Sequence, residues 1–287
     1  MNRLIAGLLS LCALALAFPS AVSSREELPS PQLLRYGEEP LQEMLFWPNT
    51  QHRDAPLIAF VHGGGWSRGD MRTGLEDHTI AHWHAQGYAV ASINYRLVPD
   101  VIVERQAGDV AEAVAMLIQR NGEFGIDDSR IVLAGHSAGA HLAALVGTDP
   151  VYFRNQGLAH DAVRGVLALD GAVYDIALAL EGAGPRRLAL YRNVFGNNPG
   201  RHRALSPVAH AAQPNVSDFL ILHVERRVAQ RQSEALADAL GDAGTQVRVE
   251  PIPGRGMRGH MEINRRMGEP DYPATPVVDE WLARVLR

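Results

Sequence analysis

The sequence predicts an α/β protein in which helices cover both faces of a mostly parallel central sheet. From Pro56 onward, short apolar runs alternate with longer segments whose apolar residues recur at helical spacing. Most of the short runs are rich in Val, Ile and Leu, as expected of strands buried on both faces. The 287 residues contain no apparent internal repeat or long low-complexity linker, so we expect a single domain over residues 24–287.

The expected elements follow one another along the whole chain. Residues 32–47 are expected to form one or two antiparallel edge strands. Further strands are expected at residues 57–61, 88–93, 130–134, 163–169, 219–224 and 246–250. Helices are expected at residues 106–120, 138–146, 230–240 and 277–286.

Residues 1–23 resemble a secretory signal peptide. Arg3 gives a positive start, residues 4–18 are nearly all apolar, and Ala21-Val22-Ser23 offers small residues for cleavage. The apolar run is shorter than the roughly 20 residues that a bilayer span needs. We therefore expect export to the periplasm or the medium, without a stable membrane anchor. The only cysteine, Cys12, lies in this segment, so the mature chain would have no thiol.

Composition narrows the class of partner. The formal net charge is −5, and no basic run with interleaved aromatic residues is present. Nucleic acid is therefore not an expected partner. A small-molecule substrate is expected instead.

A candidate nucleophile lies in the motif Gly135-His136-Ser137-Ala138-Gly139. The motif joins a predicted buried strand to a predicted helix, which is the context of a nucleophile elbow. A serine at such a corner has a strained backbone, and the glycines two residues away let the chain segments approach closely. The beginning of the helix also favours an oxyanion.

A second motif, His62-Gly63-Gly64-Gly65-Trp66, directly follows the strand at residues 57–61. A glycine run lets backbone N–H groups turn inward without a Cβ in the way. No Gly-Lys-Ser/Thr follows and no G-x-G-x-x-G opens a helix, which argues against a phosphate-binding loop. We expect the N–H groups of Gly64, Gly65 and Ala138 to form an oxyanion hole.

Together these motifs resemble a known family. HGGGW, then INYRL at residues 93–97, then Asp109, then GIDDSRIVLAGHSAGAH resemble the α/β-hydrolase esterases of the hormone-sensitive-lipase and feruloyl-esterase-like (BD-FAE) group. The resemblance extends from about Tyr36 to the last helix. It implies the α/β-hydrolase fold and a triad of serine, acid and histidine.

The chain order of this fold places the base and the acid after Ser137. His260 alone among the histidines follows the last predicted strand, in a glycine-rich loop at residues 254–259, and we expect it to be the base. For the acid we favour Glu225, because Arg227 stands about where relatives carry Asp. Asp170, at the end of an earlier strand, is the alternative.

The predicted function is hydrolysis of small to moderate carboxylic esters through an acyl-enzyme on Ser137. Trp66 is an expected substrate contact, as is Tyr191 in the long segment 171–218. This mechanism needs neither a metal nor an organic cofactor. His78, His82 and His84 could suggest a metal site, but the first two are one helical turn apart and no third ligand is evident. Two alternatives are an arylformamidase-like amide hydrolase and a non-catalytic binding protein on the same fold.

Overall fold

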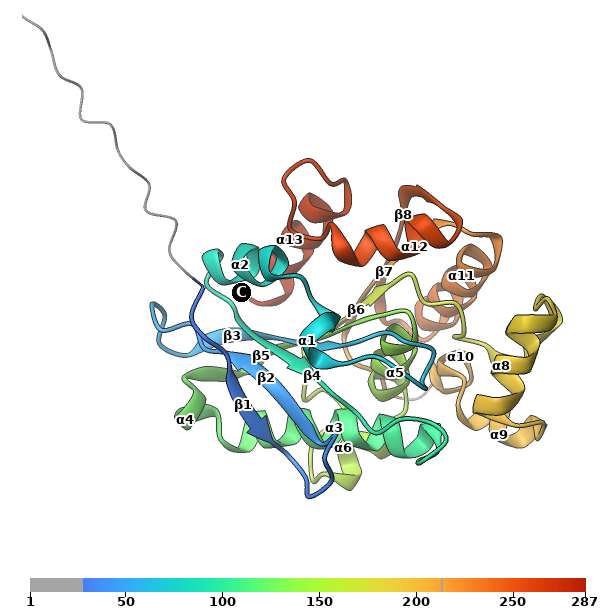
Figure 1. The fold of residues 1–287 in the computed structure, drawn as a ribbon, viewed down its shortest axis with the longest axis horizontal. Helices are drawn as coiled ribbons and strands as arrows, with labels where there is room; N and C mark the ends of the chain where they lie inside the picture. The colour runs from blue at the N-terminus through green and yellow to red at the C-terminus, as the bar shows by residue number, and fades with distance from the viewer. Residues whose placement is uncertain (1–27, 213) are drawn as a thin grey trace, which may run out of the picture.

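An eight-stranded sheet forms the centre of the computed structural model, which describes residues 28–212 and 214–287 (Figure 1). The predicted signal peptide lies outside the described residues. The strands lie in the order β1-β2-β4-β3-β5-β6-β7-β8. β1 pairs with β2 and β2 with β4 in antiparallel fashion, and the other neighbours are parallel. The strands are β1 (Gln32–Arg35), β2 (Glu43–Trp47), β3 (Ala55–Val61), β4 (Ala89–Ile93), β5 (Ile126–His136), β6 (Gly165–Leu169), β7 (Asp218–Glu225) and β8 (Gln246–Arg255).

Helices cover both faces of this sheet (Figure 1). They are α1 (Met71–Gly74), α2 (Asp77–Ala85), α3 (Val103–Gln119), α4 (Asn121–Phe124), α5 (Ala138–Thr148), α6 (Val151–Asn155), α7 (Ile176–Glu181), α8 (Pro185–Phe195), α9 (Pro199–Ala204), α10 (Pro207–His210), α11 (Arg227–Asp242), α12 (Gly256–Arg265) and α13 (Ala274–Val285). Among the residues described, no helix has the length and apolar character that a membrane crossing requires.

The two faces of the sheet bury two separate clusters of apolar side chains. In β3, Leu57 and Val61 belong to the cluster shared with α3 and α5. Ile58 and Phe60 belong to the other cluster, shared with α2 and α13. Because side chains alternate along a strand, a strand covered on both faces is apolar at consecutive positions. This burial explains the apolar runs in the sequence.

The predicted architecture is confirmed, and the structure alters some boundaries. The six strands expected after residue 56 and all four expected helices are present, and residues 32–47 supply β1 and β2. The expected glycine-rich loop at residues 254–259 is wrong, because these residues end β8 and begin α12. His260 and Ile263 are buried on one side of α12, and an exposed ion pair joins Arg258 to Glu262 on the other. This amphipathic burial stabilises a helix despite the glycines.

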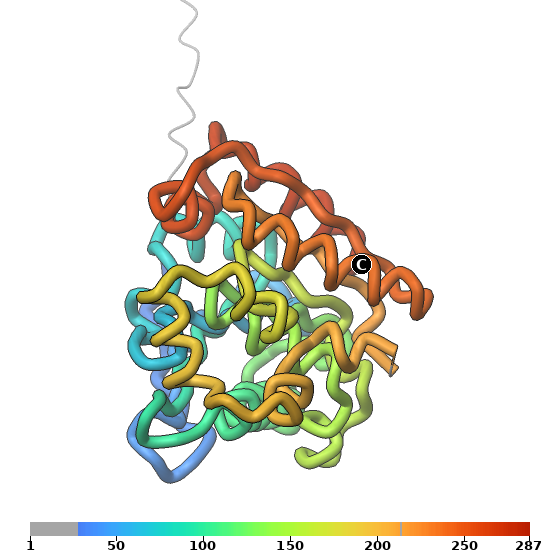
Figure 2. Tube along the Cα trace, turned by 90° about the vertical axis from the view of Figure 1, so that its right-hand side faces the viewer, coloured from blue at the N-terminus to red at the C-terminus, as the bar shows by residue number. Residues whose placement is uncertain are grey.

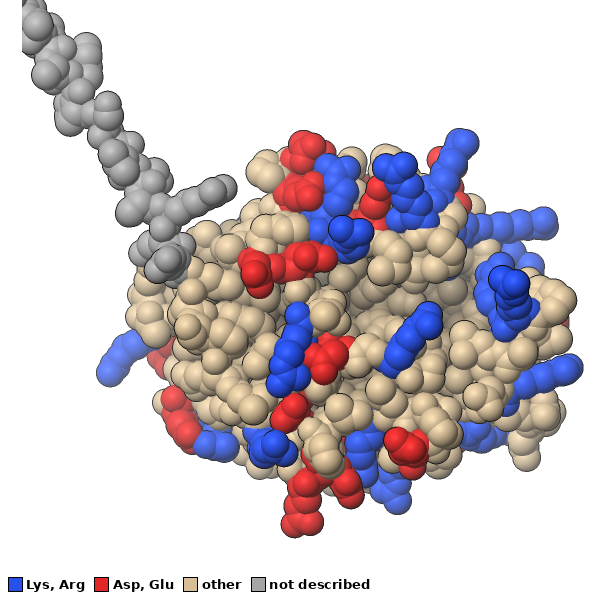
Figure 3. All heavy atoms as spheres, viewed as in Figure 1, with Lys and Arg blue, Asp and Glu red and all other residues tan. Residues whose placement is uncertain are grey.

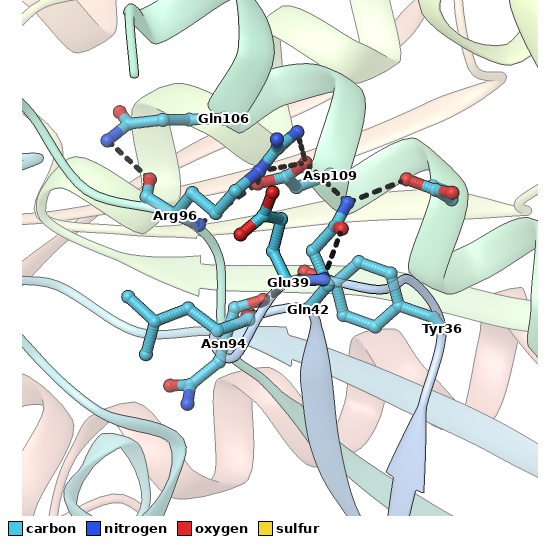
Figure 4. A network of polar contacts seen from close by, with 9 residues as sticks. Tyr36, Glu39, Gln42, Asn94, Arg96, Gln106 and Asp109 are labelled. Atoms are coloured by element: carbon cyan, nitrogen blue, oxygen red, sulfur yellow. Dashed lines mark hydrogen bonds and ion pairs between the residues drawn. The ribbon is translucent and has the colours of Figure 1, made fainter. Parts of the chain in front are cut away.

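A buried polar network holds the loop that follows β3 (Figure 4). The side chain of Asp109, on α3, is 1% exposed and forms an ion pair with Arg96 at 2.5 Å. The Nε2 amide of Gln106 donates to the carbonyl of Arg96 at 2.8 Å and to that of Trp66 at 2.7 Å. The INYRL segment and α3 therefore fix the backbone of the glycine motif at Trp66.

Candidate active site

Ser137 occupies a strained corner between β5 and α5. Its φ of 56° and ψ of −113° are costly for a residue with a Cβ. A Cβ at Gly135 would collide with the carbonyl of Gly139, and one at Gly139 would collide with the carbonyl of Val61. The serine N–H donates to Leu169 O at 2.9 Å. Close backbone packing on both sides therefore maintains the strained conformation.

The glycine loop after β3 supplies the expected amides. Gly64 has a φ of 129°, and a Cβ there would collide with the carbonyl of Arg68, so only glycine fits. Within the described residues, neither Gly64 nor Gly65 donates its N–H to a protein acceptor. Ala138 is the first residue of α5, where a backbone N–H has no partner inside the helix. All three residues line the same cavity as Ser137.

The structure places His260 against Asp170. Asp170 directly follows β6 and is fully buried, and its Oδ2 lies 2.6 Å from Nδ1 of His260. Ser137 directly follows the neighbouring strand β5, where His136 is in register with Leu169. Ser137 and His260 both line the cavity. The alternative acid of the sequence analysis is thus the carboxylate that contacts the histidine.

The expectation that Glu225 contacts the histidine is wrong. Glu225 ends β7 with its side chain 61% exposed, and it pairs with Arg255, which is 84% exposed, at 2.6 Å. Such exposed pairs contribute little to stability. The buried part of β7 ends at Val224, so Glu225 lies at the exposed end of the strand.

Arg226 is a neighbour of Asp170 that the sequence analysis did not identify. Its Nη2 lies 2.6 Å from Oδ2 of Asp170 and donates to the backbone O of Asp170 at 2.9 Å. The backbone N–H of Val224 donates to the other carboxylate oxygen at 3.1 Å. A buried carboxylate is stable only when paired and hydrogen-bonded, and these contacts meet that requirement. Nothing in the sequence distinguishes Arg226 from the neighbouring Arg227, so this contact could not be predicted.

Two buried histidines support the site. Nε2 of His136 donates to the backbone O of His260 at 2.8 Å, and the two rings are 4.6 Å apart. His141 accepts a hydrogen bond from Nε1 of Trp66 at 3.2 Å and donates to Leu205 O at 2.9 Å. Burial lowers the pKa of His136 to about 3 and the pKa of His141 to about 4. Both rings are therefore neutral at pH 7.

The cavity at Ser137 has a volume of about 420 Å³. Trp66 and Tyr191 line it, in the positions expected for substrate contacts, and Leu190 lies beside them on α8. The Trp66 ring packs edge-on against Phe195, with centroids 4.8 Å apart. In Figure 2, the yellow segment that carries α8 lies on the side of the molecule facing the viewer, below the red C-terminal segment. α8 therefore forms one wall of the cavity.

Two of the three histidines of α2 have structural partners. Nε2 of His82 lies 2.9 Å from Oδ1 of Asp279 on α13, and Nε2 of His84 lies 3.1 Å from Pro48 O. Across residues 28–212 and 214–287, no three His, Cys, Asp or Glu side chains gather in an arrangement that could hold a metal ion.

The sheet order and the strand–serine–helix corner define the α/β-hydrolase fold. The model of the BD-FAE family matches residues 44–240, and the chain belongs to this family. The esterase LipC of Mycobacterium tuberculosis is 30% identical over 239 residues, which cover 77% of this chain and 58% of LipC. The chain spans about half the length of the curated relatives it matches: the aligned part covers 58% of LipC and 47% of a second esterase, LipQ.

Solved structures share the fold. Esterase B from Lactobacillus rhamnosis superposes with a TM-score of 0.72 at 21% identity, covering 89% of this chain and 84% of that one. A truncated carbohydrate esterase from gut microbiota superposes with a TM-score of 0.73 at 20% identity, covering 90% of this chain and 96% of that one.

The buried histidines predict a loss of stability in mild acid. Their pKa values are lower in the folded chain than the unperturbed value of about 6.5, so below that pH the unfolded chain binds protons that the folded chain does not. The contribution is complete above pH of about 6.5 and is lost as the pH falls. Each histidine should lower the free energy of unfolding by about 1.4 kcal/mol per pH unit between pH of about 6 and 5.

Urea unfolding measured across that range checks this expectation. His141→Gln should reduce the slope, whereas His160→Gln, at an exposed position, should leave it unchanged. A free energy of unfolding that is constant across the range would contradict the burial of two neutral rings.

Proposed function

We propose that the protein is a serine hydrolase that cleaves carboxylic esters through an acyl-enzyme on Ser137. The observation that carries this proposal is the convergence on one cavity of Ser137, His260 and the glycine loop. The buried contact between Asp170 and His260 supports the roles of acid and base. The esterase names of the relatives agree with this proposal.

In the proposed mechanism, His260 is the general base. Donation of its Nδ1–H to Asp170 leaves Nε2 unprotonated, so that Nε2 can accept the proton of the Ser137 hydroxyl. The serine oxygen then bonds to the ester carbonyl carbon, and the carbonyl oxygen becomes an oxyanion. His260 returns the proton to the departing alcohol, and water releases the acid by the same steps.

The amides of Gly64, Gly65 and Ala138 are the proposed oxyanion donors. Their fixed orientation stabilises the charge as it forms, without reorganisation during the reaction. One such donor typically contributes about 2.7–4 kcal/mol to transition-state stabilisation. Trp66 and Tyr191 are the proposed substrate contacts. A cavity of about 420 Å³ lies in the range for small-molecule sites, which supports small to moderate esters as substrates.

A fluorophosphonate probe tests the proposal on the purified protein. We expect covalent labelling of Ser137 and none of Ser137→Ala, together with hydrolysis of 4-nitrophenyl acetate. Hydrolysis of N-formylkynurenine in preference to the acetate would support the arylformamidase-like alternative. Absence of both labelling and hydrolysis would support the binding protein.

Matched carboxylate variants test the acid. Asp170→Asn should lower kcat by about 10⁴, because the amide favours the wrong tautomer of His260 while keeping its shape. Glu225→Gln is the control, and it should leave kcat near the wild-type value because its exposed side chain contacts Arg255. A large loss in Glu225→Gln with little loss in Asp170→Asn would overturn the assignment.

We also propose export directed by residues 1–23. The support is the pattern of a charged start, an apolar core and small residues before Ser24. The same probe, applied to separated cell fractions, should label a protein in the periplasm or medium. Labelling confined to the cytoplasm would contradict export.

A further inference from the structure

The cavity beside Ser137 is lined by more positive than negative side chains. The formal net charge of the chain is −5, yet Arg68, Arg187 and Arg226 all line the cavity. Among the described residues that line it, Asp70 is the one carboxylate. In Figure 3, the charged side chains over α8, at the right of the view, are mainly arginines.

The charge of Asp70 has its own partner outside the cavity. Oδ1 of Asp70 accepts the backbone N–H of Arg72 at 2.8 Å, which caps α1. The guanidinium of Arg72, which does not line the cavity, lies 3.4 Å from the same carboxylate. Arg226 is likewise paired with Asp170. Arg68 and Arg187 are therefore the lining arginines that have no carboxylate partner among the described residues, and they leave a positive field in the cavity.

Two of the arginines, Arg187 and Arg226, line the cavity together with Tyr191. Arg187 precedes Tyr191 by one helical turn on α8, so the two side chains lie on the same face of that helix. Arg226 approaches from the turn between β7 and α11. Burial raises the pKa of Tyr191, and the positive charges of Arg187 and Arg226 oppose that rise, as their proximity requires. In the described part of the chain, the Tyr191 hydroxyl has no hydrogen-bond partner.

The guanidinium of Arg226 has donors that the protein does not use. Nη2 is bonded to Asp170, but Nε is buried and has no partner among the described residues. Arg187 has no carboxylate partner in the same part of the chain. Nη1 of Arg226, the guanidinium of Arg187 and the Tyr191 hydroxyl have no hydrogen-bond partner among the described residues, and all three residues line the same cavity. This combination favours a carboxylate, which guanidinium binds through charge-assisted hydrogen bonds.

We propose that the ester substrate carries a carboxylate that Arg187, Arg226 and the Tyr191 hydroxyl bind, an inference that rests on the esterase function proposed above. The rest of the substrate is apolar, because Leu190, Met257 and Met261 complete this side of the cavity. Met257 and Met261 are 64% and 47% exposed, so they form an apolar rim at its opening. The substrate class is therefore an amphipathic half-ester or an ester of a carboxylate-bearing alcohol.

Two pairs of esters test the proposal on the full-length protein. The first pair is mono-4-nitrophenyl adipate and 4-nitrophenyl heptanoate, which place or omit a carboxylate in the acyl group. The second pair is 4-acetoxybenzoate and 4-acetoxytoluene, which do so in the alcohol. For each ester, kcat/KM is divided by its rate of alkaline hydrolysis. In at least one pair, the charged ester should exceed the neutral one by about tenfold.

Arg187→Gln should reduce this preference by about tenfold, and about 0.5 M NaCl should reduce it in the wild type. Arg186→Gln is the matched control, because Arg186 precedes Arg187 on α8 but does not line the cavity, and it should leave the preference unchanged. Hydrolysis of the neutral esters with no preference for the charged ones would overturn the inference alone. Equal effects of the two substitutions would also overturn it. If none of the four esters is hydrolysed and the fluorophosphonate probe does not label the protein, the proposed function is overturned as well.

Discussion

The close approach of three backbone segments around Ser137 is the constraint on which the candidate site depends. Gly139 lies so near the carbonyls of Val61 and His62 that no Cβ fits between them. These carbonyls belong to the residues that lead directly into the glycine loop. The same contact therefore holds Ser137 in its strained conformation and sets its distance from the amides of Gly64 and Gly65. A larger residue at 139 would separate the two halves of the site, even if the fold were retained.

Electrostatic interactions of Asp170 hold together the rest of the candidate site. Asp170 is fully buried, and its carboxylate contacts His260 on α12 and Arg226 after β7. A buried charge with several partners ties these elements together, because the loss of any partner leaves an uncompensated charge. Since Oδ2 lies within 2.6 Å of both His260 and Arg226, the arginine also shares the negative charge that would stabilise a protonated His260. Arg226 thus connects the proposed triad with the proposed carboxylate site.

The sequence predicted the fold because the pattern of burial is local. Consecutive apolar residues such as Ile58 and Ala59 face opposite sides of the sheet, so a strand covered on both faces is visible in the sequence alone. The glycine motifs were equally clear, since only glycine tolerates such positions. The acid could not be chosen from the sequence. Its partner His260 lies 90 residues away, and the burial that distinguishes Asp170 from Glu225 arises only in the folded chain. The available signal was that Asp170 directly follows the apolar run 165–169, at the end of a predicted buried strand where a carboxylate needs partners. The first turn of α12, residues 256–259, was predicted as a loop because its glycines favour one, and packing of Ile263 outweighs them.

A crystal structure of the protein inhibited by a phosphonate ester is the decisive test of the proposed catalytic geometry, because the adduct mimics the tetrahedral intermediate. We expect a covalent bond from phosphorus to the Ser137 oxygen. We also expect one phosphoryl oxygen within about 3.1 Å of the amides of Gly64, Gly65 and Ala138, with Nε2 of His260 facing the serine oxygen. An adduct whose phosphoryl oxygen faces solvent, with His260 turned away from the serine, would contradict this geometry.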